Sequence, residues 1–100
     1  MTDDERADNL HKVLYDFLRY RDGVSRGALS EGHLSRMGGV PDAVLDDVLA
    51  SIEWGIRQSD FDYWKYAPTL PEDRATVVTW LEIALRDLRA LRARRGESRS

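Results

Sequence analysis

The sequence predicts a single, mainly α domain that contains a small β-ribbon ahead of a long, amphipathic C-terminal helix. Apolar residues recur at helical spacing within residues 10–18, 44–52 and 77–91, which is the pattern of helices that bury one face. Two short stretches, 56–58 and 63–66, are rich in aliphatic and aromatic residues and flank a polar turn, as two paired strands do. A length of 100 residues fits one domain.

The first helix is expected to run from about Thr2 to Tyr20. Thr2 and Glu5 have the spacing of a capping box, in which each side chain satisfies a backbone N–H at the start of a helix. The Asp22-Gly23 pair is a turn signal that ends this helix. Its inward face contains Leu10, Val13, Leu14, Phe17 and Leu18.

A second, weaker helix is expected over residues 26–37, because the glycines within it each cost about 1 kcal/mol relative to alanine. Gly38-Gly39 then provides a tight turn. A third helix opens at Pro41-Asp42, where proline and an acid both suit the first turn, and we expect Gly55 to end it. Its apolar stripe contains Val44, Leu45, Val48, Leu49 and Ile52.

The two strands of the ribbon, 56–58 and 63–66, are predicted to pair across the turn 59–62. The last helix follows over about residues 69–95, with Thr69 and Glu72 as a second capping box. A heptad seam along it indicates either a homodimer interface, which the width of the stripe favours, or packing onto the first helix. The residues of this seam are Val77, Leu81, Ala84, Leu88 and Leu91. Residues 1–95 therefore form the expected domain, and 96–100 an expected flexible tail.

Composition excludes several classes of protein. The chain has no cysteine, so a disulfide scaffold and a cysteine-ligated metal are excluded. No apolar run approaches the ~18–20 residues of a membrane span, and the acidic N-terminus is unlike a secretory signal; we expect a cytoplasmic protein. His11 and His33 lack the spacing of a helical metal pair, and no phosphate loop or nucleophile elbow is present. We expect no catalytic residue, metal or cofactor.

The expected elements follow the order helix, link, helix, tight turn, helix and ribbon. The specific residues are His33-Leu34-Ser35-Arg36-Met37-Gly38-Gly39-Val40-Pro41, the helix 42–54, Trp54-Gly55-Ile56-Arg57-Gln58 and Tyr63-Trp64-Lys65-Tyr66-Ala67-Pro68. This pattern resembles the winged helix-turn-helix domain, and the last helix resembles the C-terminal extension through which some bacterial winged-helix regulators dimerise. The resemblance implies that the third helix lies in the major groove of double-stranded DNA.

A DNA-binding regulator is the leading functional hypothesis, with one departure from the family pattern. No Arg, Lys, Asn or Gln lies between Pro41 and Gly55, although these types make most base and phosphate contacts. The formal net charge is −3, but residues 84–100 contain six arginines against two acids. Contacts to phosphate are therefore expected from outside the third helix. The candidates are Arg26, Arg36, Arg57, Gln58, Lys65, Arg92, Arg94 and Arg95.

The alternative hypothesis is a protein-interaction module or inhibitor. The outer face of the third helix is acidic and ends in a tryptophan, so it could dock on a basic protein surface or imitate the charge of nucleic acid. Aromatic residues are enriched at the energetic centres of interfaces. The candidate interface residues are Asp46, Asp47, Trp54 and Trp64.

Overall fold

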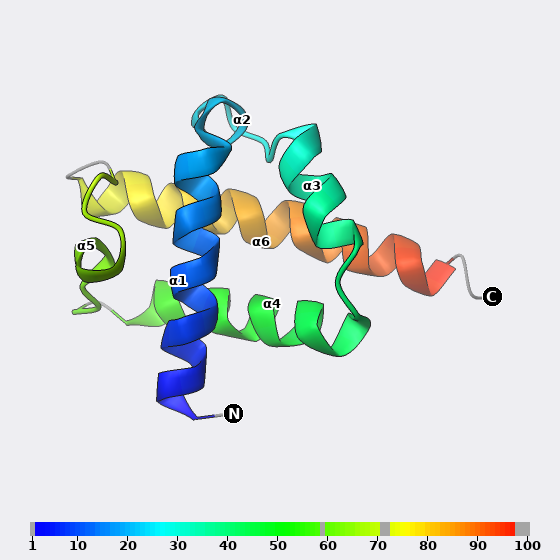
Figure 1. The fold of residues 1–100 in the computed structure, drawn as a ribbon, viewed down its shortest axis with the longest axis horizontal. Helices are drawn as coiled ribbons and strands as arrows, with labels where there is room; N and C mark the ends of the chain where they lie inside the picture. The colour runs from blue at the N-terminus through cyan, green and yellow to red at the C-terminus, as the bar shows by residue number, and fades with distance from the viewer. Residues whose placement is uncertain (1, 59, 71–72, 98–100) are drawn as a thin grey trace.

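The chain is a small, all-α globular domain in the computed structural model, which describes residues 2–58, 60–70 and 73–97 (Figure 1). Across these ranges it forms six helices and no strand. None of the helices described is both long and apolar enough to span a membrane. The helices are α1 (Asp3–Arg19), α2 (Arg21–Ser25), α3 (Glu31–Gly38), α4 (Asp42–Arg57), α5 (Tyr63–Tyr66) and α6 (Arg74–Glu97).

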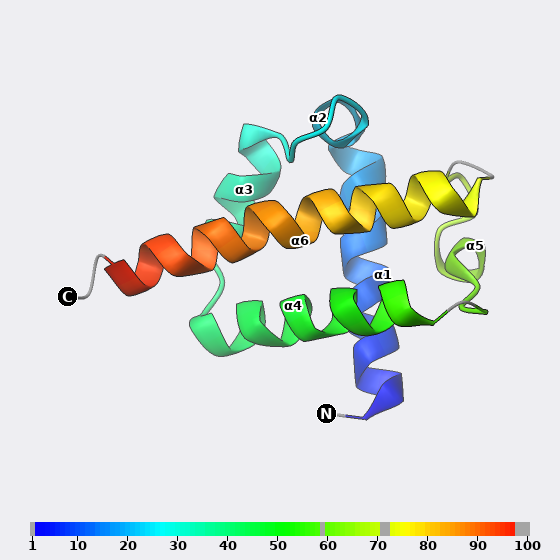
Figure 2. The ribbon, with the colours of Figure 1, turned by 180° about the vertical axis from the view of Figure 1, so that it is seen from behind.

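Two long helices, α4 and α6, lie side by side and run in opposite directions, and α1 crosses them on one face (Figures 1 and 2). The short helix α5 lies at one end, where the chain passes from α4 to α6, while α2 and α3 lie along the other edge of α6. The core fills the space where α1, α4 and α6 meet. Its fully buried side chains include Leu10, Leu14, Phe17, Leu45, Ile52, Val77, Leu81 and Leu88.

The long helices were largely predictable from apolar spacing and from caps. The Thr2 hydroxyl accepts a hydrogen bond from the backbone N–H of Glu5 at 3.2 Å, as the capping box predicts. Leu45, Val48 and Ile52 are buried as expected, but Val44 is 44% exposed, so the inward stripe of α4 is narrower than the sequence indicated.

The predicted β-ribbon, and with it the wing, is wrong. Residues 56 and 57 continue α4, and 63–66 form the helix α5. Gly55 does not stop α4; it is buried where α4 crosses α1, and a Cβ there would lie 2.6 Å from Leu10 Cδ2. Asp62 then caps α5 by accepting the N–H groups of Trp64 and Lys65. The glycine therefore permits close helix packing, and the aspartate favours a helix over a strand.

Other predicted boundaries shift for identifiable reasons. The second helix begins at Glu31 and not near residue 26, because Gly27 has a φ of +100° and Ser30 caps α3 through the N–H of His33. Residues 21–25 form a separate helix, α2, that was not predicted. The last helix begins at Arg74 and continues to Glu97, through the first part of the predicted tail. Glu72 and residues 98–100 lie outside the described part of the chain.

Candidate functional site

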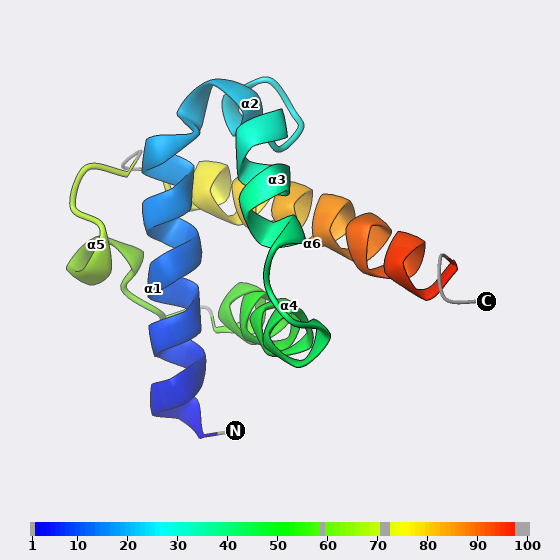
Figure 3. The same ribbon diagram turned by 45° about the vertical axis from the view of Figure 1, so that its right-hand side comes forward.

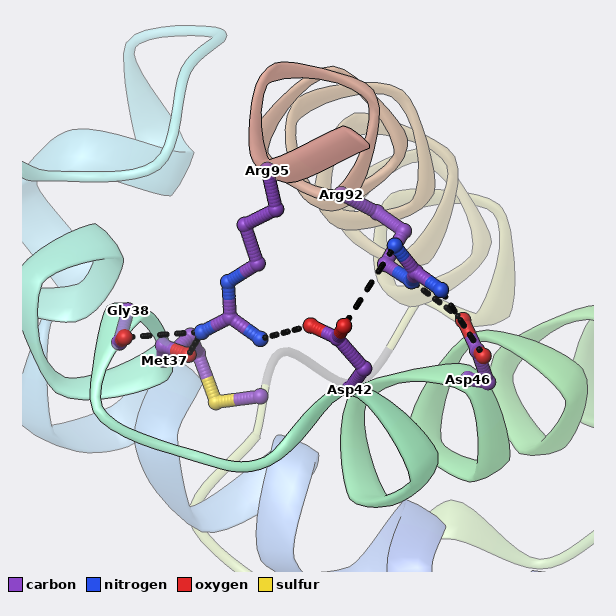
Figure 4. A network of polar contacts seen from close by, with 6 residues as sticks. All are labelled: Met37, Gly38, Asp42, Asp46, Arg92 and Arg95. Atoms are coloured by element: carbon purple, nitrogen blue, oxygen red, sulfur yellow. Dashed lines mark hydrogen bonds and ion pairs between the residues drawn. The ribbon is translucent and has the colours of Figure 1, made fainter. Parts of the chain in front are cut away.

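Three arginines in the second half of α6, Arg89, Arg92 and Arg95, form ion pairs with acidic residues of α4. Arg92 Nε donates to Asp46 Oδ1 at 2.8 Å, and Arg95 Nη1 donates to Asp42 Oδ1 at 3.1 Å (Figure 4). One turn earlier, Arg89 forms an ion pair with Glu53. We call this row of contacts the α4–α6 seam. In this seam, acidic side chains of α4 are paired with arginines of α6 from the same chain.

Arg95 also fixes the turn between α3 and α4. Its Nη2 donates to the backbone carbonyls of Met37 and Gly38 at 2.9 and 2.7 Å (Figure 4). Carbonyls in the last turn of a helix have no partner within the helix, and that of Met37 also accepts the backbone N–H of Val40. Arg92 is less sheltered, and its hydrogen bond to Asp46 raises the pKa of the Arg92 guanidinium above its ordinary value. Exposed ion pairs of this type contribute about 1 kcal/mol or less, so the seam positions helices more than it stabilises them.

The residues predicted to bind nucleic acid do not converge on one surface. Arg36 lines a hollow on α1, Arg57 and Gln58 line another at the end of α4, and Arg94 lines a third beside Leu34. Arg57 forms an ion pair with Glu53 at 3.3 Å. Arg26 is exposed in the turn after α2, and Lys65 is exposed on α5. Arg92 and Arg95 belong to the α4–α6 seam.

The predicted partner and dimer residues have several different environments. Asp47 is exposed on α4, whereas Asp46 is held by Arg92. Trp54 packs edge-on against Phe61, with ring centroids 5.3 Å apart, and the half-buried Trp64 packs beside Tyr63. The predicted dimer residues, which form the heptad pattern of α6, are mostly internal. Val77, Leu81, Ala84 and Leu88 are fully buried within the single chain, and Leu91 is half-buried. These residues form the core between α6 and its neighbours, and four of the five are not on the surface.

A hollow of about 390 Å³ lies along α1, and Arg36 of α3 forms part of its wall. Figure 3 shows α3 near the second half of α1. This volume lies within the usual range of ligand clefts. Tyr15 is 53% exposed, and its ring centroid lies 4.8 Å from that of His11. We call this feature the α1 hollow. It is lined by Asp8, His11, Lys12, Tyr15, Asp16, Arg19 and Arg36.

Two of the residues that line the α1 hollow, Asp16 and Arg36, belong to a polar cluster that includes the buried His33. Asp16 is only 5% exposed; its Oδ1 accepts from Arg36 Nη1 at 2.6 Å, and its Oδ2 lies 3.6 Å from His33 Nε2. His33 is 1% exposed and stacks on Tyr20, with ring centroids 5.3 Å apart. Burial lowers the pKa of His33, and the attraction of Asp16 offsets this only in part. His33 is therefore neutral near neutral pH, and Arg36 balances the charge of Asp16.

The rim of the α1 hollow continues as a basic surface toward α2. Arg19 also lines the neighbouring hollow, which contains Arg21. The two hollows together have four cations and three carboxylates on their walls, in a chain whose net charge is −3. Two of the cations are already used, because Lys12 pairs with Asp8 and Arg36 with Asp16. Arg19 and Arg21 form no ion pair with any residue that the structure describes. We call Lys12, Arg19, Arg21 and Arg36 the basic face.

Neither the α1 hollow nor the basic face was predicted from the sequence. One signal was available: Asp16 lies next to Phe17 on a helix whose inward face is apolar, and a charge there needs a partner. Comparison of the chain with family models, with curated proteins and with solved structures finds no match. Among the described residues no group of three or more His, Asp or Glu side chains could hold a metal ion.

Proposed function

We propose that this chain is a protein-interaction module that docks an acidic segment of a partner protein on the basic face. The observation that carries the proposal is the contrast between two sets of arginines. Those of the α4–α6 seam are matched by carboxylates of the same chain, whereas Arg19 and Arg21 are exposed and have no carboxylate partner in the described ranges. The charge on this surface that no carboxylate of the described residues pairs with is therefore positive.

The proposed partner is acidic, whereas the sequence indicated a basic protein partner. The acidic residues of α4 were expected to face a basic protein, but Arg92 and Arg95 already occupy Asp46 and Asp42. A partner would have to displace these contacts. Arg19 requires no such displacement, and Tyr15 beside it supplies the exposed aromatic surface that is typical of interface centres.

Double-stranded DNA is the second candidate, because phosphate would be recognised by the same guanidinium groups, and Arg26 is exposed just beyond α2. Three observations favour a protein partner. The α4 helix offers no Arg, Lys, Asn or Gln before Arg57, and two of its acids, Asp42 and Asp46, are ion-paired with arginines of α6. The chain is also acidic overall, whereas proteins that depend on phosphate contacts have a strongly basic surface.

A titration with two polyanions tests the proposal. A fluorescent, glutamate-rich peptide with a central phenylalanine and a labelled DNA duplex are each titrated with the chain at about 50 mM salt. We expect the peptide to bind saturably. The Arg19→Glu substitution should weaken this binding at least tenfold, because it reverses one charge at the docking surface. Arg94→Glu, the same charge change on an exposed arginine of α6, is the control and should leave peptide binding unchanged.

The same titration separates the two candidates. The DNA hypothesis would replace the protein-interaction proposal under one combination of results: the chain does not bind the peptide, it binds the duplex tightly and in a salt-sensitive way, and both Arg19→Glu and Arg94→Glu weaken binding of the duplex. Peptide binding that falls equally in both variants would mean that any positive charge suffices, and it would remove the basic face as the docking site.

A further inference from the structure

The geometry points to a specific anchor for the docked segment: an apolar ring next to a carboxylate, with the ring in the α1 hollow and the carboxylate on Arg19. This inference rests on the proposed function and adds the chemistry that the partner must present. It concerns the α1 hollow, where an aromatic wall and an unpaired guanidinium occur together.

The wall of the hollow is suited to a ring. The exposed ring of Tyr15 and the adjacent ring of His11 provide two aromatic surfaces 4.8 Å apart, inclined at 49°. The methylene groups of Lys12, Arg19 and Arg36 can line the remaining sides while their charged ends stay in water. An apolar ring in this position would remove the surface of Tyr15 from water, which is favourable.

The charges along the hollow fix the direction of the docked group. Asp8 lies at one end of the α1 face and Arg19 at the other. A carboxylate near Asp8 would be repelled, and Arg36 is already hydrogen-bonded to the buried Asp16. Arg19 has no such partner among the described residues, so it is the group that can hydrogen-bond a new carboxylate, and charge-assisted hydrogen bonds of this type are the strong ones.

The length of the hollow favours a peptide segment over a small molecule. Its lining extends along α1 from Asp8 to Arg19, which corresponds to about 16 Å at the helical rise of ~1.5 Å per residue. An extended chain covers that distance with roughly five residues. A partner segment can therefore place a ring beside Tyr15 and an acid beside Arg19 at the same time.

Three peptides of equal length separate the contributions of the ring and of the charge. The reference has glutamates around a central phenylalanine, the second replaces the phenylalanine with alanine, and the third replaces the glutamates with glutamines. Binding of unlabelled peptide is measured by calorimetry on the full chain. We expect the reference peptide to bind most tightly and each of the other two to bind at least tenfold more weakly. For the alanine peptide the reason is that burial of a phenylalanine side chain is worth about a tenfold change in affinity or more.

A matched pair of variants tests the location. Tyr15 and Val44 are both large, exposed hydrophobic residues, but Val44 lies on α4 and does not line the hollow. Tyr15→Ala should reduce the preference for phenylalanine over alanine to less than threefold, whereas Val44→Ala should preserve it. Both side chains are exposed, so both variants are expected to fold, which far-UV circular dichroism verifies.

The outcomes separate this inference from the proposed function. Equal affinity of the phenylalanine and alanine peptides would overturn the anchor and leave an acid-binding module. Equal affinity of the glutamate and glutamine peptides would overturn both the role of Arg19 and the proposed docking of an acidic segment. Absence of binding by all three peptides would overturn the proposed function and the anchor together.

Discussion

Replacement of Gly55 with alanine is expected to destabilise the chain, even though Gly55 lies inside a helix and alanine is the better helix former. The new Cβ would lie 2.6 Å from Leu10 Cδ2 and 3.3 Å from Leu10 Cδ1, and Leu10 is fully buried. Overpacking of this type costs about 1–3 kcal/mol, and the gain in helix propensity returns about 1 kcal/mol. At Gly38 a Cβ would meet nothing within 4 Å, so Gly38→Ala should gain up to about 1 kcal/mol.

Urea unfolding followed by far-UV circular dichroism measures this difference, with an unchanged m-value as the check that only the folded state is affected. We expect Gly55→Ala to be less stable than Gly38→Ala by about 1–3 kcal/mol. In a Leu10→Ala background the methyl group has room, so Gly55→Ala should there become neutral or stabilising. Equal shifts for the two alanine variants, with no coupling to Leu10, would refute the packing explanation of Gly55.

Three further variants test other contacts by the same unfolding assay. Burial holds the pKa of His33 below 6.5 in the folded chain, so below about pH 6.5 the unfolded chain binds more protons than the folded chain, and the free energy of unfolding should decline as the pH falls through the folded pKa. His33→Gln should flatten this dependence of stability on pH between about pH 7 and 5.5. An unchanged dependence would contradict the burial of a neutral His33. Tyr63→Phe removes the buried 2.9 Å hydrogen bond to the Gly55 carbonyl and should cost about 1 kcal/mol; an unchanged free energy of unfolding would contradict a stabilising role of this hydrogen bond. Arg95→Ala should cost about 1–3 kcal/mol because it removes the three hydrogen bonds that the guanidinium donates to Asp42 and to the carbonyls of Met37 and Gly38, and a loss no larger than that of Arg94→Ala would contradict the structural role of Arg95.

The parts of the fold that the sequence predicts are those in which local patterning and tertiary packing agree. The cap at Thr2 and the apolar faces of the long helices belong to this class. Gly55 does not, because a glycine that ends a helix and a glycine that lets two helices approach are identical in sequence. Only the position of Leu10, 45 residues earlier in the chain, distinguishes them. The wing was inferred from that expected helix end and from the strand-like stretches 56–58 and 63–66, which the structure places in α4 and its C-terminal end and in α5.

The functional surfaces were hidden for a similar reason. A count of arginines in residues 84–100 indicates a basic end, but it does not show that Arg92 and Arg95 face Asp46 and Asp42 across the α4–α6 seam. The charge that remains unmatched depends on these long-range pairs. Arg19 has little distinction in the sequence, and it becomes a candidate only because Lys12 and Arg36, the other cations of the α1 hollow, are already paired.

The most direct test of the account is an NMR titration of the ¹⁵N-labelled chain with the glutamate-rich phenylalanine peptide. The account predicts saturable changes in the amide signals of residues 8–19 and of α3 near Arg36, with little change along the α4–α6 seam. Changes concentrated on the seam, or no changes at peptide concentrations that saturate the calorimetric signal, would contradict the assignment of the docking site to the α1 hollow.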